Sequence, residues 1–408
     1  MEVRPGYKQT AVGVVPEEWD IKQFAELFAF RNGVNADRES YGQGVRFINV
    51  LEPITYSHLY GPEITGQVTL PESVAASYAV RKGDVLFNRT SETQEEVGLA
   101  ATYLGVEEVV FGGFVIRGRP IDQSLDPIYS GYALRAPFIR SQIIPMGQGA
   151  IRANIGQQNL SLVVAPVPPL PEQRAIAESL SDVDALLGAL NQLIAKKRDL
   201  KQAAMQQLLT GQTRLPGFHG DWEVKRFADV AFPRRDRVDP RRTGVHEFCV
   251  ELEHIESASG ILLGSTSTGD QSSLKSVFCA GDVLFGKLRA YLRKYWLATR
   301  SGVCSTEIWV FVPNDCLITT GYLFQLIKTD QFIEAASNAY GTHMPRSDWN
   351  VVKNYEMKVP PLPEQTAIAE VLSDMDAGLA ALEQRRDKTR ALKQGMMQEL
   401  LTGRTRLV

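Results

Sequence analysis

The sequence predicts an α+β fold in which two similar domains alternate with two long helices. Three observations lead to this prediction. One stretch of the chain occurs twice, each copy has the apolar spacing of a long helix, and the segments before the two copies share short motifs in the same order. A match at a fixed offset is the signature of an internal repeat.

The repeat covers residues 168–215 and 360–407, which align without a gap at an offset of 192. About two thirds of the aligned positions are identical, and both copies begin with Pro-Pro-Leu-Pro-Glu-Gln. Proline fits the first turn of a helix, and an acidic side chain there complements the helix dipole. Both copies end in Leu-Leu-Thr-Gly, where Gly211 and Gly403 can adopt the left-handed conformation that terminates a helix.

Each copy is therefore expected to form one helix of roughly 58 Å. A second interpretation stays open, because Ser181 and Ser373, each followed three residues later by Asp, resemble a capping box. The helix would then restart at that serine and leave a longer arm of roughly 42 Å.

Apolar residues in each copy recur at alternating spacings of four and three, which is typical of a coiled-coil seam. A seam this narrow needs a partner helix, and the other copy is the nearest one. Two unrelated amphipathic helices on separate cores are the alternative. The seam positions are Ile176, Leu180, Val183, Leu187 and Leu190 in the first copy, and Ile368, Leu372, Met375, Leu379 and Leu382 in the second.

The two remaining segments resemble each other faintly. Trp19 corresponds to Trp222, and Gly-Asp-Val-Leu-Phe occurs in both segments. A Gly-Asp step before an apolar run indicates a turn that leads into a buried strand. We therefore expect compact α+β domains at 1–167 and 216–359, and helical regions at 168–215 and 360–408.

The two helices are expected to pair antiparallel. A parallel pair would require the second domain, with a radius of gyration near 15 Å, to carry the chain back along a helix of roughly 58 Å. The antiparallel arrangement gives a rod with a pseudo-two-fold axis and one domain at each end.

Composition narrows the possible functions. The formal net charge is −3, and the four segments in chain order carry −4, +1, 0 and 0, so DNA binding would require basic side chains gathered on one face. No apolar run is long enough to span a membrane, and the N-terminus lacks the apolar core of a signal peptide. The four cysteines form no CxxC pair and the five histidines show no metal-ligand spacing, so we expect a reduced cytoplasmic protein without a metal site.

A rod with two similar but diverged heads holds two reading surfaces at a fixed distance and with opposite polarity. Duplex DNA has the matching symmetry, because two-fold related modules read half-sites at a fixed separation. Since the heads differ in sequence, their half-sites should differ too. The arrangement suggests an asymmetric bipartite DNA site with an unread spacer.

The doubled helix start Pro-Leu-Pro-Glu-Gln…Ile-Ala-Glu…Leu-Ser-x-x-Asp, with a Gly-Asp-Val-Leu-Phe strand in each preceding domain, resembles the specificity subunit of type I restriction-modification enzymes. The resemblance covers the whole chain. It implies that 1–167 and 216–359 are target recognition domains. It also implies double-stranded DNA, two modification (methyltransferase) subunits and two restriction (translocase and nuclease) subunits as partners.

The resemblance places catalysis in the partner subunits, with S-adenosylmethionine, ATP and Mg²⁺ expected there and no cofactor in this chain. The residues agree, because the chain has no Asn-Pro-Pro-Tyr-type methyltransferase motif and no GxxxxGKS/T phosphate loop. We expect a non-catalytic subunit. The alternatives are a coiled-coil scaffold whose heads bind proteins, and an enzyme with an unrecognised site in one head.

Candidate DNA contacts are basic and polar side chains in loops, because arginine can read guanine by two hydrogen bonds or bind phosphate. A solvated loop is the alternative for each of them. In the first domain they are Arg31, Arg46, Asn88, Arg89, Thr90 and Arg152, and in the second Arg234, Arg235, Arg237, Arg241, Arg242, Lys287, Arg289, Tyr291, Arg293, Lys294, His343 and Arg346.

The outward faces of the helices are candidates for docking the modification subunits. Glu172, Gln173, Glu364 and Gln365 are the residues assigned to this role. Helix capping is an equal alternative for these two Glu-Gln steps.

Overall fold

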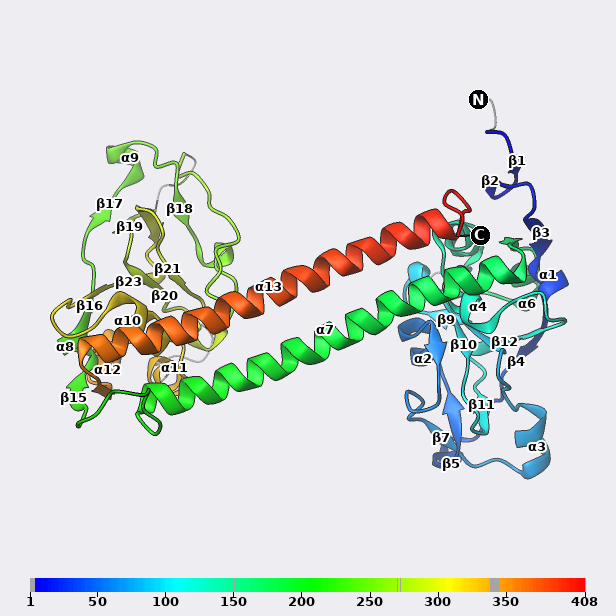
Figure 1. Cartoon of the computed structure of the whole chain (residues 1–408), viewed down its shortest axis with the longest axis horizontal. Coiled ribbons are helices and arrows are strands. Elements are labelled where there is room, and N and C mark those ends of the chain that lie inside the picture. The colour runs from blue at the N-terminus through cyan, green and yellow to red at the C-terminus, as the bar shows by residue number, and fades with distance from the viewer. Residues whose placement is uncertain (1–3, 150–151, 270, 272, 338–344, 408) are drawn as a thin grey trace. The chain divides into compact units, whose positions relative to one another are not determined.

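The computed structural model describes residues 4–149, 152–269, 271, 273–337 and 345–407. The chain forms two compact units, of which unit 1 comprises Met1–Leu190 and Arg385–Val408 and unit 2 comprises Asn191–Gln384. Each unit contains one head and one half of each long helix, α7 (Leu170–Thr210) and α13 (Leu362–Leu400) (Figure 1).

The head of unit 1 is built on a five-stranded sheet in the order β4-β12-β8-β10-β6. The two strands β8 and β10 are buried at every position, because continuous apolar runs suit a sheet that is covered on both faces. A second sheet has the order β11-β5-β7. The bounds are β4 Phe28–Asn32, β12 Val115–Pro120, β8 Val85–Asn88, β10 Ala100–Tyr103, β6 His58–Leu59, β11 Val109–Phe111, β5 Tyr41–Ile48 and β7 Gln67–Val68.

Short elements complete the head of unit 1. Three two-stranded pairs are β1-β2, β13-β9 and β14-β3. These strands are β1 Tyr7–Thr10, β2 Gly13–Pro16, β3 Asp20–Gln23, β9 Thr90–Ser91, β13 Ala153–Asn154 and β14 Val164–Val167. The helices are α1 Phe24–Leu27, α2 Leu51–Thr55, α3 Glu72–Ser77, α4 Pro127–Ala133, α5 Pro137–Ile143 and α6 Gln157–Ser161, with 3₁₀ turns η1 Arg38–Ser40, η2 Gln94–Glu96 and η3 Ile144–Met146.

The head of unit 2 repeats this plan. Its sheet β16-β23-β20-β21 corresponds to β4-β12-β8-β10, with the same antiparallel pairings. A second sheet is β17-β19-β22-β18, and β15 pairs with β24. These strands are β16 Ala231–Pro233, β23 Ile308–Pro313, β20 Val283–Gly286, β21 Tyr295–Leu297, β17 Arg237–Val238, β19 Lys275–Phe278, β22 Gly302–Ser305, β18 Cys249–Val250, β15 Glu223–Arg226 and β24 Glu356–Val359.

The helices of this head are also short, and α10, α11 and α12 occupy the places along the chain that α4, α5 and α6 have in unit 1. They are α8 Phe227–Val230, α9 Pro240–Thr243, α10 Thr320–Leu326, α11 Asp330–Ser337 and α12 Trp349–Val352, with 3₁₀ turns η4 Leu252–His254 and η5 Ala290–Leu292. The prediction of two similar α+β heads is confirmed.

Both long helices run without a break, so neither restarts at Ser181 or Ser373. Within each unit the two halves are antiparallel, as predicted. In unit 1, Lys393 pairs with Asp184 at 2.6 Å, while Leu400 packs with Ile176 nearer the start of α7. In unit 2, Lys201 pairs with Asp376 and Arg198 pairs with Glu383. Residue numbers therefore fall along α7 as they rise along α13, so the two helices are antiparallel.

The predicted seam has a second role that the spacing did not reveal. Ile176 and Leu180 pack in one cluster with Trp19, Tyr129 and Tyr132 of the head as well as with the end of α13. The equivalent Ile368 and Leu372 lie in the core of unit 2. Leu190 and Leu379 are also buried, whereas the other four seam residues, Val183, Leu187, Met375 and Leu382, are half-buried. The first turns of each helix therefore belong to the head.

A buried carboxylate fixes the start of each long helix. Glu172 has no exposed surface, accepts a hydrogen bond from Trp19 Nε1 at 2.8 Å and pairs with Arg406. In unit 2, Glu364 does the same with Trp222 Nε1 at 3.1 Å and with Arg214 at 2.5 Å.

The neighbouring glutamines hold the chain that enters each helix. Gln173 accepts a hydrogen bond from the Asp126 N–H and donates to the carbonyls of Ser124 and Pro168, each at 2.8 Å. Gln365 makes the same three bonds, to Thr319, Leu317 and Pro360. All four residues of the Glu-Gln steps are fully buried, so the assignment of Glu172, Gln173, Glu364 and Gln365 to partner docking is wrong.

A second polar contact joins each head to the helices and differs between the units. In unit 1 the Tyr132 hydroxyl donates to Asp184 at 2.8 Å. In unit 2 the equivalent carboxylate, Asp376, receives the buried ammonium of Lys328 at 3.0 Å. Burial lowers the pKa of Lys328 to about 8, although Asp376 opposes this shift.

The first prediction concerns Glu172→Gln. The substitution removes the buried counter-charge of Arg406, which then keeps only the exposed Glu18 as a partner. We therefore expect a loss of about 2 kcal/mol in the free energy of unfolding, measured by urea denaturation of the full chain. The control Glu178→Gln, on an exposed position of the same helix, should change it by less than about 0.5 kcal/mol. Equal effects of the two variants would contradict the proposed role of Glu172.

The second prediction concerns pH. The folded-state pKa of Lys328 lies below its ordinary value of 10.5, so the unfolded chain binds more protons between about pH 8 and that value, and this residue adds stability as pH rises through that window. Lys328→Met should remove this gain. Its stability relative to the native chain should therefore be greatest near pH 7 and decline by pH 10 in urea denaturation.

The matched control is Lys358→Met, because Lys358 is exposed on β24. Its stability difference from the native chain should be the same at pH 7 and pH 10. A pH-independent difference for Lys328→Met as well would show that Lys328 is not desolvated.

Candidate nucleic-acid interface

In each head one loop leaves the central strand and is held against the segment that precedes the long helix. Connection 1 (residues 89–99) joins β8 to β10, and connection 2 (residues 287–294) joins β20 to β21. The Ile155 N–H donates to the Arg89 carbonyl at 3.0 Å, and the Ser347 N–H donates to the Lys287 carbonyl at 2.8 Å. These matching bonds make the two connections structurally equivalent.

The polar residues predicted at connection 1 are mostly held inside the fold. Asn88 is fully buried and donates to the Glu96 carbonyl at 3.1 Å, so its assignment as a DNA contact is wrong. Arg89 donates to the Gly113 carbonyl at 3.1 Å, and Thr90 donates to Asn154 at 2.6 Å. Both side chains are half-buried.

Arg152 is the most exposed of the basic candidates near connection 1. Its side chain is 59% exposed, and its guanidinium lies 3.7 Å from Glu92. Connection 1 itself carries Glu92, Glu95 and Glu96. Its surface is therefore acidic, with one basic residue placed beside it.

Connection 2 has the opposite charge, with four basic residues in eight. Two of them anchor the loop: Lys294 donates to the carbonyls of Leu252 and Ile255 at 2.7 and 2.8 Å, and Arg293 pairs with Asp330. The other two, Lys287 and Arg289, have no side-chain hydrogen bond or ion pair among the residues that the structure describes.

The surroundings of connection 2 combine basic, aromatic and acidic side chains, the last including Asp348. Lys287 and Arg346 line a shallow hollow together with Trp309 and Trp349. Arg346 also pairs with Glu307 at 2.9 Å, and this bond raises the pKa of Arg346. His343, another predicted contact, lies outside the described residues.

The basic run from Arg234 to Arg242, which includes β17 and most of α9, divides into side chains held by an acidic partner and side chains that are not. Arg234 makes a two-pronged contact with Asp282, with both distances 2.9 Å, and this bond raises the pKa of Arg234. Arg241 pairs with Asp239 at 2.9 Å. The exposed members are Arg235, Arg237 and Arg242.

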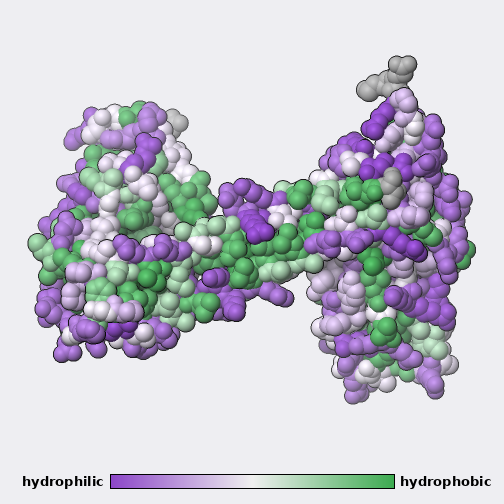
Figure 2. Space-filling view, in the orientation of Figure 1, coloured by the Kyte–Doolittle hydropathy of each residue, from purple (hydrophilic) through white to green (hydrophobic). Residues whose placement is uncertain are grey.

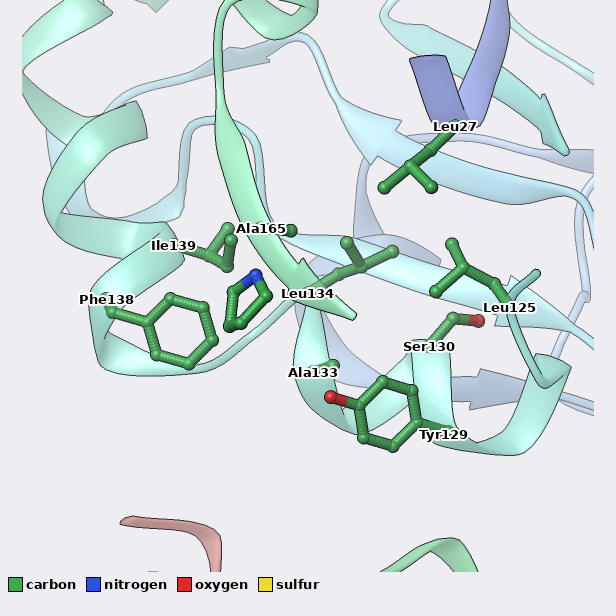
Figure 3. A pocket seen from close by; sticks show the side chains of 10 residues that line it. Leu27, Leu125, Tyr129, Ser130, Ala133, Leu134, Phe138, Ile139 and Ala165 are labelled. Carbon is green, nitrogen blue, oxygen red and sulfur yellow. The ribbon is translucent and has the colours of Figure 1, made fainter. Parts of the chain in front are cut away.

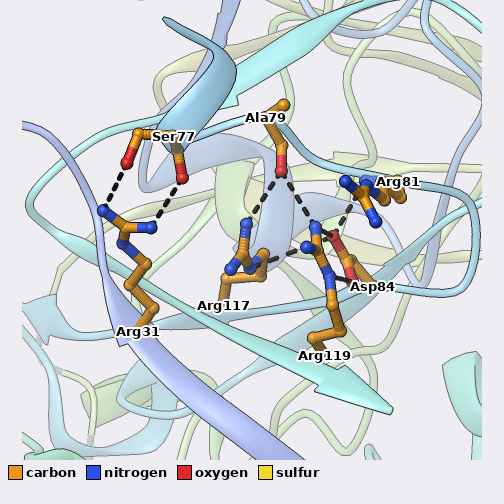
Figure 4. Close-up of polar contacts among 7 residues, drawn as sticks. All are labelled: Arg31, Ser77, Ala79, Arg81, Asp84, Arg117 and Arg119. Carbon is orange, nitrogen blue, oxygen red and sulfur yellow. Dashed lines mark hydrogen bonds and ion pairs between the residues drawn. The ribbon is translucent and has the colours of Figure 1, made fainter. Parts of the chain in front are cut away.

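Unit 1 contains a similar fork, that is, two hydrogen bonds from one guanidinium to the carboxylate before the central strand, although its arginine lies on β12 and not next to the strand that corresponds to β16. The sequence did not single it out. Arg119 contacts both oxygens of Asp84, at 2.9 and 2.7 Å, and Arg117 donates to the Ala79 carbonyl at 2.8 Å (Figure 4). Arg31 binds Ser77 through its carbonyl and its hydroxyl. The signal that could have revealed the fork is the Gly-Asp step, which both heads share before the same strand.

Arg46 is also engaged within the head. It donates to the carbonyls of Gly61 and Ile64 at 3.1 and 2.7 Å and pairs with Glu107 at 2.7 Å. Together with Arg31 it belongs to the arginines that stabilise loops of unit 1. Neither has a guanidinium that is free to meet a ligand without breaking these bonds.

A small cavity in unit 1 lies between α4, α5 and β14 (Figure 3). Its lining is apolar apart from Ser130 and the hydroxyl of Tyr129, which is buried and has no hydrogen-bond partner among the residues that the structure describes. It has room for about one water molecule and is therefore too small for a cofactor. In the described part of the chain, no group of three or more His, Cys, Asp or Glu side chains could hold a metal ion. Within the same residues, no helix is long and apolar enough to cross a membrane.

Comparison with known proteins identifies the family. The model of the type I restriction modification DNA specificity domain matches residues 16–197 and 266–390, which is most of the chain. The chain belongs to this family. Each matched segment combines part of one head with most of the long helix that follows it.

Similar specificity subunits have low sequence identity but matching length. The putative type I restriction enzyme MjaX specificity subunit of Methanocaldococcus jannaschii is 24% identical, over 98% of this chain and 97% of that protein. The EcoDI specificity subunit of Escherichia coli is 25% identical, over 64% and 65% respectively.

Solved structures share the fold. The S subunit of a type I restriction-modification system from M. genitalium covers 98% of both chains with a TM-score of 0.58 at 13% identity. A chain from a structure of type I system assembly and conformational transition covers 96% of this chain and 99% of its own, with a TM-score of 0.56 at 16% identity.

The third prediction separates arginines that anchor the fold from exposed arginines in this specificity subunit. Arg234→Met removes the fork to the buried carboxylate of Asp282, so it should lower the free energy of unfolding by about 2 kcal/mol in urea denaturation. The adjacent exposed residue serves as the control, and Arg235→Met should leave stability within about 0.5 kcal/mol. If Arg234→Met left stability unchanged, its assignment as an anchor would be refuted.

Proposed function

We propose that this specificity subunit directs a type I restriction-modification complex to an asymmetric bipartite DNA site. The heads at 1–167 and 216–359 act as target recognition domains, and the helical regions 168–215 and 360–408 space them. The observation that carries this proposal is the pair of equivalent connections, placed alike in the two heads but opposite in charge. Equivalent placement supports two reading surfaces, and opposite charge supports two different half-sites.

The DNA contacts proposed for the second head are basic side chains that form no salt bridge among the described residues; Arg289 is exposed and Lys287 is half-buried. Arg289 reads a base edge, because a guanidinium can donate two hydrogen bonds to guanine. Lys287 binds phosphate, which fixes position but carries no sequence information. The exposed arginines of the basic run, Arg235, Arg237 and Arg242, add phosphate contacts.

The first head is proposed to read its half-site differently. Carboxylates accept hydrogen bonds from the amino group of cytosine, and Glu92 and Glu95 present them on connection 1. Arg152 supplies the compensating positive charge for the backbone. Thr90 and Arg89 are proposed as secondary contacts, since both lie at the base of this connection.

The partners proposed for the helices are two modification subunits, with two restriction subunits completing the complex. Figure 2 shows hydrophobic residues on the surface of the long helices. In unit 2, Leu193 and Leu200 of α7 are one heptad apart and 40% and 48% exposed. Exposed apolar side chains that recur along one helix face support a surface for another protein. S-adenosylmethionine, ATP and Mg²⁺ are proposed to act in those subunits, and the complex is proposed to work in the cytoplasm.

The fourth prediction tests the function by co-expressing the chain with the modification subunit of the same organism and mapping methylated adenines by sequencing. The native complex should yield one asymmetric motif with an unread gap. Arg289→Ala should relax a single base position in one half of that motif and weaken binding to the full site roughly tenfold. The other half should stay unchanged.

The control is Arg300→Ala, because Arg300 is exposed in the same head but follows the other end of β21 from connection 2 and lies over the Phe248 ring. It should preserve the motif. A complex that assembles without producing any motif would refute the recognition role, and failure of the chain to join the modification subunit would favour a separate scaffold.

A further inference from the structure

The turn η5 at the tip of connection 2 presents two large side chains to solvent. Tyr291 is 55% exposed and Leu292 is 39% exposed, and they are neighbours in sequence. Neither residue belongs to a hydrophobic core cluster of unit 2. These two neighbouring side chains form a small apolar surface at the tip of a loop that is otherwise basic.

The backbone on either side of this turn is strained. Arg289 has φ 54 and Arg293 has φ 53, the left-handed region that residues other than glycine rarely adopt. Such strain persists where surrounding contacts over-determine the conformation, and it concentrates at functional sites. Two left-handed arginines that flank a three-residue turn therefore need strong anchors.

The anchors are present on both sides of the turn. The Arg289 N–H donates to the Pro345 carbonyl at 2.9 Å, and the Arg293 guanidinium holds Asp330 and the Lys328 carbonyl. Lys294 ties the end of the loop to two more carbonyls. The tip is thus clamped, so Tyr291 and Leu292 are held ready for a ligand at low entropic cost.

The positive charge of connection 2 indicates which class of ligand it would bind. Lys287 and Arg289 precede the apolar tip in the loop and have no acidic partner among the described residues. A ligand that offers anionic groups outside and a stack of apolar faces inside matches this surface. Duplex DNA has that construction, and proteins that bend it insert apolar side chains between base steps.

We propose that Leu292 inserts between two base pairs of the half-site read by the second head, with Tyr291 stacked beside it. The inference rests on the proposed function and specifies how this one half-site is read. Insertion unstacks the step and kinks the duplex, which favours a flexible pyrimidine–purine step at that position. The turn η2 in the equivalent place of the first head consists of Gln94, Glu95 and Glu96, so the other half-site stays unkinked.

The test uses the complex of the full chain with its modification subunit and a duplex that contains the mapped motif. The base analogue 2-aminopurine replaces adenine in turn at steps of both half-sites, because its fluorescence rises when its neighbour unstacks. The methylated adenines and their neighbours are left out of the series, because a methyltransferase flips its target base out of the stack. At the remaining steps, fluorescence with the native chain should rise at one step in one half-site only. Leu292→Ala should abolish that rise and weaken binding roughly tenfold, while Leu292→Met should retain both.

The matched control is Leu274→Ala, which removes a leucine that is 47% exposed elsewhere in unit 2. It should leave fluorescence and affinity unchanged. Thermal unfolding of each variant checks that the head is folded. If fluorescence does not rise with the native chain, or if the rise persists in Leu292→Ala, the proposed insertion of Leu292 is wrong. The proposed function is tested separately, and it fails if methylation mapping of the native complex yields no defined motif.

Discussion

The carboxylate buried at the start of each long helix is the interaction on which both units depend. An ionised side chain in an apolar cluster is costly unless it is paired and hydrogen-bonded. Glu172 meets this condition through Trp19 and Arg406, and Glu364 through Trp222 and Arg214. Because each arginine follows the helix of the other repeat, the carboxylate is satisfied only when the two helices lie antiparallel. One local requirement thereby fixes the direction of both helices in each unit.

The heads keep their scaffold separate from their variable surface. In each head an aspartate before the central strand binds an arginine through two hydrogen bonds, and it also caps its own turn by accepting a backbone N–H three residues earlier. The variable connection leaves the opposite end of that strand. The fork therefore holds the strand in place while the connection is free to change length and charge. Glutamates in one head and arginines in the other can occupy equivalent positions without altering the sheet.

The sequence allowed the architecture to be predicted because its signals are local and duplicated. The repeat gave two equivalent helices, and their spacing gave a seam that the burial of Ile176 and Ile368 agrees with. The individual contacts could not be predicted, since they join residues far apart in the chain. In the sequence, Glu172 looks like any acidic residue in the first turn of a helix, because its partner Trp19 lies 153 residues away. Arg234 reads as one of a basic run, and only its fork to Asp282 shows that it is an anchor.

The make-up of unit 1 has a consequence for synthesis on the ribosome. Unit 2 is one continuous stretch of chain, whereas unit 1 combines the first part of the chain with the last. Domains generally fold as they emerge, so the second head can close while its C-terminal neighbour is still being made. The first head must wait, with Trp19 and Glu172 already in place, until Arg406 leaves the exit tunnel. The domain that is translated first is therefore the last to be completed, and a chain that stops early lacks the arginine that would finish it.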